Sequence, residues 1–175
     1  MKTKIFIDGR EGTTGLRIVS RFAQRDDVEW ISIPEEKRKD PKTRSDCINA
    51  SDYTFLCLPD AAAKEAVGLV RNDHVRIIDA STAHRTAPGW AYGFPELSKE
   101  HRRQIALSNR VAVPGCYASG FAACVYPLVT SGVITPDYPV CCHAVSGYSG
   151  AGKKAIAVYE GAGRPLSYDS PRQYA

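Results

Sequence analysis

The chain lacks any hydrophobic run close to the roughly 20 residues that a membrane-spanning helix requires. Its N-terminus offers only Ile5, Phe6 and Ile7 before Asp8, too few for the hydrophobic segment of a secretory signal. The net charge is only +4, without the stripe of basic and aromatic residues that binds nucleic acid. We therefore expect a cytoplasmic globular protein that binds neither membranes nor nucleic acid, with basic residues suited to a phosphorylated small molecule.

Paired cysteine motifs are also missing. The chain has six cysteines, but none shows the C-x-x-C spacing of a zinc or redox site. Cys57, Cys141 and Cys142 lie in apolar runs that predict buried strands, where a free cysteine behaves as a small hydrophobic residue. We expect no disulfide and no metal site.

What is present is an alternation of strand-like and helix-like segments over the first 115 residues. The apolar runs predict strands at 4–8, 28–33, 53–58, 75–80 and 111–113, and the helical spacings predict helices at 14–24, 61–70 and 97–105. Residues 34–44 are expected to form a charged loop, and 81–95 an irregular segment. Strands of continuous apolar character predict a parallel sheet covered on both faces, which gives an α/β fold with a Rossmann-like doubly wound sheet.

The pattern changes after residue 115. A helix is expected to continue through 121–129, followed by a strong strand at 138–145, a Gly/Ser loop at 147–152 and a helix at 153–159. The tail, 161–175, has no regular pattern. We predict a dinucleotide-binding domain at 1–115 and the incomplete beginning of an α+β catalytic or dimerisation domain at 116–175.

A glycine-rich turn follows the first predicted strand. Gly9, Gly12 and Gly15 have the spacing G-x-x-G-x-x-G, which differs from the commonest dinucleotide fingerprint. Glycines let the backbone approach a diphosphate at the start of the following helix, so the position of the turn favours a cofactor site. Farther on, Glu35 and Glu36 could hold a ribose hydroxyl, while the basic run 37–39 could hold a 2′-phosphate. Charge alone leaves NAD and NADP open.

Cys116 lies where an apolar run breaks at Pro114-Gly115 and a helix-forming stretch begins. The start of a helix favours the thiolate, which is the nucleophilic form of cysteine. A cysteine nucleophile normally works with an acid/base partner. The four histidines offer no convincing candidate, because His84 lies in a loop beside Arg85 and His143 lies on a predicted strand.

Six ordered segments now support a resemblance. They are 8–15 (DGREGTTG), 58–59 (LP), 79–85 (DASTAHR), 92–97 (YGFPEL), 114–117 (PGCY) and 146–153 (SGYSGAGK). In these segments the chain resembles the N-acetyl-gamma-glutamyl-phosphate reductases, in the shorter (type 2) form of that family, within the aspartate-semialdehyde dehydrogenase superfamily. The resemblance covers nearly the whole chain.

The resemblance implies that Cys116 is the catalytic nucleophile and that the cofactor is NADP(H). It implies cofactor-binding residues in three segments: Gly9, Gly12, Thr13, Thr14, Gly15, Ser81 and Gly150. It further implies a role in arginine biosynthesis, an acyl phosphate substrate reduced through a cysteine thioester, and a homo-oligomer at full length.

Two alternatives remain open at this stage. The sister activity, aspartate-semialdehyde dehydrogenase, shares the cofactor, the nucleophile and the chemistry. A dinucleotide-binding module without turnover is the other, because the family's acid/base histidine lies past the matched region. Relatives are longer and only 59 residues follow Cys116 (175 − 116), so we expect a truncated product.

Overall fold

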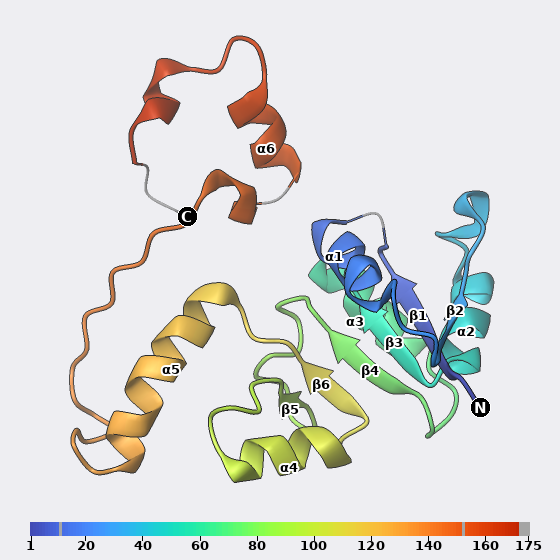
Figure 1. Ribbon diagram of the computed structural model, residues 1–175, viewed down its shortest axis with the longest axis horizontal. Helices are drawn as coiled ribbons and strands as arrows, with labels where there is room; N and C mark the ends of the chain where they lie inside the picture. The colour runs from blue at the N-terminus through green and yellow to red at the C-terminus, as the bar shows by residue number, and fades with distance from the viewer. Residues whose placement is uncertain (11, 152, 172–175) are drawn as a thin grey trace. The chain divides into compact units, whose positions relative to one another are not determined.

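The computed structural model describes residues 1–10, 12–151 and 153–171, which fall into two compact units, Met1–Val140 and Cys141–Ala175. The first unit is built on a six-stranded sheet with the order β2-β1-β3-β4-β6-β5 (Figure 1). All of its strand pairs are parallel. Its strands are β1 (Thr3–Asp8), β2 (Val28–Ile31), β3 (Tyr53–Leu56), β4 (Arg76–Asp79), β5 (Ala91–Tyr92) and β6 (Arg110–Ala112). The Rossmann-like parallel sheet predicted from the sequence is confirmed.

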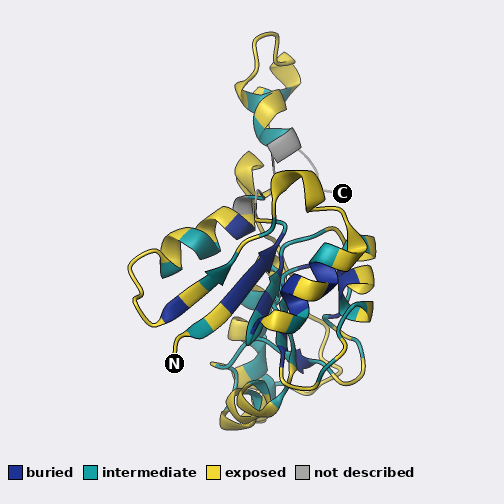
Figure 2. Cartoon of the chain, turned by 90° about the vertical axis from the view of Figure 1, so that its right-hand side faces the viewer, coloured by how far each residue is buried: buried dark blue, intermediate teal, exposed yellow. Residues whose placement is uncertain are grey.

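Helices cover both faces of the sheet between β2 and β4. On one face, α1 (Thr13–Phe22) packs Ile18, Val19 and Phe22 against Ile5 and Ile7 of β1. The opposite face, which includes Phe6 and Leu56, is covered by α2 (Pro41–Ala50) and α3 (Asp60–Gly68). Because side chains alternate along a strand, β1, β2 and β3 each contribute to both cores. Figure 2 shows the buried residues concentrated in these strands and on the inner sides of the helices.

The charged loop predicted for 34–44 is wrong in its second half, because α2 begins at Pro41. Asp40 caps this helix by accepting a hydrogen bond from the Thr43 amide at 2.7 Å, and proline at the first helical position suits a helix start. Residues Glu35–Lys37 form a short 3-10 helix ahead of it.

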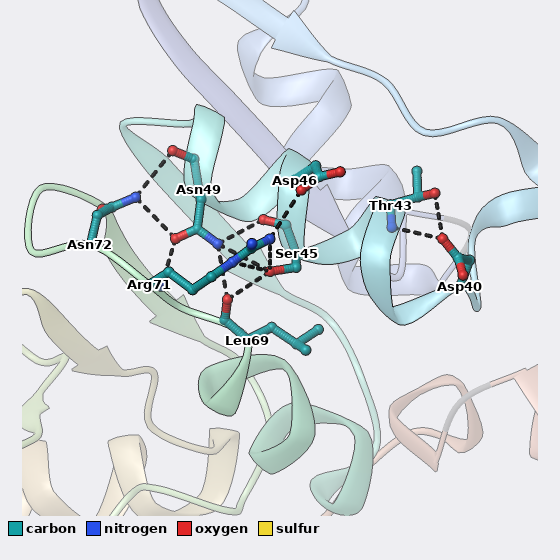
Figure 3. A network of polar contacts seen from close by, with 8 residues as sticks. All are labelled: Asp40, Thr43, Ser45, Asp46, Asn49, Leu69, Arg71 and Asn72. Carbon is teal, nitrogen blue, oxygen red and sulfur yellow. Dashed lines mark hydrogen bonds and ion pairs between the residues drawn. The ribbon is translucent and has the colours of Figure 1, made fainter.

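A polar network fixes α2 to the segment that follows α3 (Figure 3). The Asn49 amide donates to the Leu69 carbonyl at 2.9 Å, and its oxygen accepts from the Arg71 backbone amide at 2.7 Å. Ser45 also donates to Leu69, and Arg71 donates to Ser45. These bonds fix the position of α2 against the sheet. That position matters because α2 carries a buried arginine that lies near the glycine-rich turn.

The remaining elements of the first unit are α4 (Lys99–Leu107) and α5 (Cys116–Thr130). No residue of α5 is buried, and Phe121 and Leu128 are each 41% exposed although the helix is mainly apolar. None of the helices in the described ranges is long and apolar enough to cross a membrane.

The strand predicted at 138–145 is wrong: residues 138–147 have no regular structure and are exposed. Cys141 and Cys142 are therefore exposed rather than buried, and Cys57 is half-buried just after β3. The second unit contains a 3-10 helix at Tyr148–Ala151, α6 (Lys153–Glu160) and a 3-10 helix at Leu166–Asp169. Strand-like residues form a strand only when a partner supplies hydrogen bonds, and the described residues provide none here.

Candidate cofactor pocket and thiol site

A cavity of about 620 Å³ opens at the carboxyl ends of β1, β2 and β3. Ligands bind α/β sheets of this type where neighbouring connections leave in opposite directions, and here that point lies between β1 and β3. Its walls come from the three segments that follow these strands: Gly9, Arg10 and Gly12; Ser32, Ile33 and Glu35; and Cys57, Leu58 and Pro59. The cavity therefore lies where the sequence predicts a dinucleotide.

Two glycines of the turn are required by its geometry. Gly9 has φ +86°, and a Cβ there would lie 2.3 Å from the Cys57 carbonyl oxygen. Gly15 lies inside α1, where a Cβ would come within 2.7 Å of the Gly9 and Arg10 carbonyl oxygens. The turn therefore lies in close contact with the segment after β3 and with α1. At the start of α1 the first backbone amides have no hydrogen-bond partner within the helix and can bind an anion. The turn thus fits a pyrophosphate group.

Gly12 differs from these two. Its nearest contact to a Cβ would be 3.4 Å, and its φ of −74° suits any residue. We expect Gly15→Ala to destabilise the chain and to weaken dinucleotide binding by at least about tenfold, because backbone atoms must move apart. Gly12→Ala is the matched control for stability and should destabilise the chain much less. Thermal unfolding of the two variants provides the measurement, and equal losses of stability would contradict the geometry. Titration of Gly15→Ala and the wild-type chain with NADPH measures the effect on binding.

A buried ion pair supports the floor of the cavity. Asp8, the last residue of β1, accepts hydrogen bonds at 3.0 Å from Nε and Nη2 of Arg44, and both side chains are 7% exposed. Nη1 of Arg44 also donates to Glu65 of α3 at 2.9 Å. Burial raises the pKa of Asp8, and the charge of Arg44 opposes that effect. The pair joins β1, α2 and α3, and its Asp8 directly precedes the glycine-rich turn.

Basic side chains are among the residues that line the cavity. Arg38 and Lys39 line it, whereas Lys37 does not, and Arg10 lies over the Trp30 ring at 5.9 Å. Glu35 also lines the cavity and pairs with Arg38 at 2.7 Å. The cavity therefore contains groups suited to either cofactor: a carboxylate that could bind a ribose hydroxyl of NAD, and two cations that could bind the 2′-phosphate of NADP.

Cys116 is exposed and is the first residue of α5, after the N-cap Gly115. The first turn of this helix carries no acidic residue. The guanidinium of Arg85 reaches the same corner, since its Nε donates to the Val113 carbonyl at 3.0 Å. A Cβ on Gly115 would lie 2.8 Å from Nη1 of Arg85, so the cation packs directly against the residue before the thiol.

The other predicted site residues are placed differently. Ser81 is buried, donates to Asp79 at 2.7 Å and does not line the cavity. Thr14 is exposed in the first turn of α1, beside Thr13 at the helix start. Gly150 lies in the second unit, where its amide donates to the Gly147 carbonyl. Their cofactor-binding roles stay predictions.

Comparison with known proteins identifies the family. Residues 27–105 match the semialdehyde dehydrogenase NAD-binding domain, and residues 116–169 match the semialdehyde dehydrogenase dimerisation domain. The chain is 53% identical over 159 residues to an N-acetyl-gamma-glutamyl-phosphate reductase of Burkholderia ambifaria, covering 91% of this chain and 50% of the relative. Trichormus variabilis has a protein of the same name that is 54% identical, with 91% and 49% covered. The chain belongs to the semialdehyde dehydrogenase family.

Within this family it is a homologue of the N-acetyl-gamma-glutamyl-phosphate reductases, and it spans about half the length of the curated relatives it matches. Solved structures of aspartate semialdehyde dehydrogenases share its fold. Aspartate semialdehyde dehydrogenase II of Vibrio cholerae superposes with a TM-score of 0.63 at 15% identity, covering 100% of this chain and 56% of that one. The Francisella tularensis enzyme gives 0.59 at 16% identity, with 89% and 48% covered.

Sequence reasoning on this semialdehyde dehydrogenase homologue missed the polar groups that hold the site in place. The sequence pattern places Arg44 in a predicted loop and does not indicate that the Asp79 carboxylate bonds to the His84 ring. The Asp40-Pro41 helix start could have revealed α2, and with it a residue facing the sheet. The pairing of Asp79 with His84 depends on how the loop after β4 folds, which no spacing rule predicts.

Proposed function

We propose that this chain carries the cofactor site and the nucleophile of an NADPH-dependent N-acetyl-gamma-glutamyl-phosphate reductase, an enzyme of arginine biosynthesis. The observation that carries the proposal is an exposed thiol at the start of α5, with an arginine packed against the preceding residue, in a chain that also has a dinucleotide-type cavity. Relatives with this name are 53% identical to the chain.

In the proposed reaction the Cys116 thiolate attacks the acyl carbon of the acyl phosphate. The bond from that carbon to the phosphate oxygen breaks, inorganic phosphate leaves with the bonding electrons, and a thioester remains on Cys116. Arg85 would offset the negative charge of the departing phosphate, because a guanidinium matches phosphate geometry. Backbone amides at the start of α5 would stabilise the oxyanion that forms on the carbonyl oxygen when the thiolate adds to the acyl carbon.

The residues of the cavity fit a dinucleotide. Gly9 and Gly15 leave no room for side chains where the turn approaches β3 and α1, and Arg38 and Lys39 add positive charge to one wall. When bound, NADPH would supply the hydride that reduces the thioester to the aldehyde. We propose residues 1–115 as the dinucleotide-binding domain and 116–175 as the beginning of the catalytic domain, in a homo-oligomeric cytoplasmic enzyme of the family's shorter form.

The cofactor preference can be tested on the basic wall. Replacing Arg38 and Lys39 together by glutamine should lower the affinity for NADPH by at least about tenfold and change that for NADH little, since charge-assisted bonds to a 2′-phosphate would be lost. Lys37→Gln is the matched control, because Lys37 neighbours both residues but does not line the cavity. Titration of the variants with both cofactors measures the effect. An equal loss for NADPH and NADH would place the 2′-phosphate elsewhere.

The substrate is tested by comparing kcat/KM for N-acetyl-gamma-glutamyl phosphate and for aspartyl phosphate in the protein that carries this chain. A strong preference for the first is expected. A preference for aspartyl phosphate would assign the chain to the sister activity, and NADPH binding without turnover of either substrate would make it a binding module.

A further inference from the structure

A buried carboxylate closes the loop that follows β4. Asp79, the last residue of β4, is fully buried and accepts three hydrogen bonds. Its donors are the Ser81 amide at 2.9 Å, the Ser81 hydroxyl at 2.7 Å and, from farther along the loop, Nδ1 of His84 at 2.6 Å. A buried carboxylate is tolerated when it is bonded in this way, and it then fixes the groups that bond to it.

The His84 ring is held on its face as well as on its edge. It is buried, and it stacks on Trp90 with the ring centroids 4.1 Å apart and the planes 10° from parallel. An edge bond and a stacked face together fix both the position and the orientation of the ring. The backbone of the next residue, Arg85, is therefore fixed too.

The Arg85 side chain connects the loop after β4 to the start of α5, where the thiol lies. Its Nε donates to the Val113 carbonyl, and its guanidinium fills the space beside Gly115. Gly115 has φ −76°, which any residue can adopt, so the glycine is required for space rather than for conformation. The loop after β4 and the loop after β6 meet here, and a positive charge lies beside the residue that precedes Cys116.

We propose that Asp79 and His84 form a positioning pair that holds the Arg85 guanidinium beside the Cys116 thiol. Neither residue is assigned contact with reacting atoms; they act through Arg85. The catalytic meaning of the pair rests on the proposed function, in which Arg85 meets the departing phosphate. The placement of the Arg85 charge beside the thiol does not depend on the proposed function, so it can be tested without measuring turnover.

The test uses two alkylating reagents of similar size and different charge. Iodoacetate is an anion and iodoacetamide is neutral, and both react with the thiolate, so the ratio of their rate constants at Cys116 cancels the thiolate fraction and reports the local charge. Peptide mass spectrometry follows each cysteine separately. Cys124 on the same helix is the internal control, since at about 1.5 Å per residue it lies about 12 Å farther along, beyond a Debye length at 0.15 M salt. Cys57 should stay unlabelled near pH 8, because burial raises its pKa to about 11.

We expect Arg85→Met to lower the iodoacetate-to-iodoacetamide ratio at Cys116 about three- to tenfold, with no change at Cys124. His84→Ala should lower it to the same extent. His84→Asn should keep the ratio near wild type, because its amide can donate to Asp79 in place of Nδ1 although it carries no charge. A His84→Ala variant with the wild-type ratio would overturn the proposal, and so would equal losses in His84→Ala and His84→Asn.

Gly115→Ala provides an independent variant in case His84→Ala does not fold. The added methyl group meets Nη1 of Arg85 and should displace the guanidinium while Asp79 and His84 remain paired, so the ratio should fall again. An unchanged ratio in both Gly115→Ala and Arg85→Met would show that the guanidinium is not beside the thiol, which overturns this inference. The proposed function is tested separately, by turnover and by the acyl group on Cys116.

Discussion

Replacing Cys116 by serine is expected to abolish reduction of the acyl phosphate, with a loss of at least about 10³-fold in kcat. A serine hydroxyl stays protonated at neutral pH, so it cannot replace a thiolate as the nucleophile. The affinity for NADPH should stay close to wild type, because Cys116 is not among the residues that line the cofactor cavity. Steady-state kinetics and NADPH titration of the protein that carries this chain measure the two quantities.

Cys124→Ser is the matched control for this substitution. Cys124 is an exposed cysteine on the same helix, so its loss should leave turnover unchanged. If the Cys116→Ser protein kept more than a few per cent of wild-type activity, the thiol would have no covalent role. If both variants lost activity equally, the effect would belong to the helix rather than to the nucleophile.

The largest expected effect on stability comes from Arg44→Met, which should lower the free energy of unfolding by about 3–5 kcal/mol near pH 7. The substitution removes the partner of Asp8, whose side chain is 7% exposed, and so leaves a buried charge without compensation. The partly exposed partner Glu65 should contribute little to the loss. Urea unfolding measures the difference, and Arg103→Met, which breaks an exposed ion pair with Glu100, should cause no measurable change.

The loss in Arg44→Met should depend on pH. Burial raises the pKa of Asp8, and without Arg44 nothing opposes that rise. A carboxyl group whose folded-state pKa is raised stabilises the fold below its unfolded pKa and loses that contribution as the pH rises through the folded value. The difference between variant and wild type should thus be smallest near pH 4 and grow toward pH 7. A constant difference across this range would mean that Asp8 is not the group left unpaired.

The sheet could be predicted because its strands are continuous apolar runs, and buried parallel strands such as β1 and β4 require that composition. The helix α2 could not be predicted from hydrophobic spacing, because half of its buried face is polar: the buried residues are Arg44, Ser45, Cys47 and Ile48. Their burial is possible only because Asp8, Leu69 and other groups distant in sequence bond to them.

In the segment 138–145 the sequence predicts an element that the structure does not contain. Its mainly apolar composition predicts a strand, but composition cannot indicate whether a neighbouring strand is available to pair with it. At the thiol, the Pro114-Gly115-Cys116 break predicts the helix start, and α5 begins at Cys116. The position of Arg85 beside that start could not be predicted, since it depends on the fold of the loop that contains His84.

The central claim is tested most directly by locating the acyl group after a single turnover. The protein that carries this chain is mixed with N-acetyl-gamma-glutamyl phosphate in the absence of NADPH, quenched with acid, digested and analysed by peptide mass spectrometry. The account predicts an N-acetylglutamyl thioester on Cys116, release of one equivalent of phosphate, and loss of the adduct when NADPH is added before the quench. An acyl group on any other residue, or phosphate release without an adduct, would contradict it.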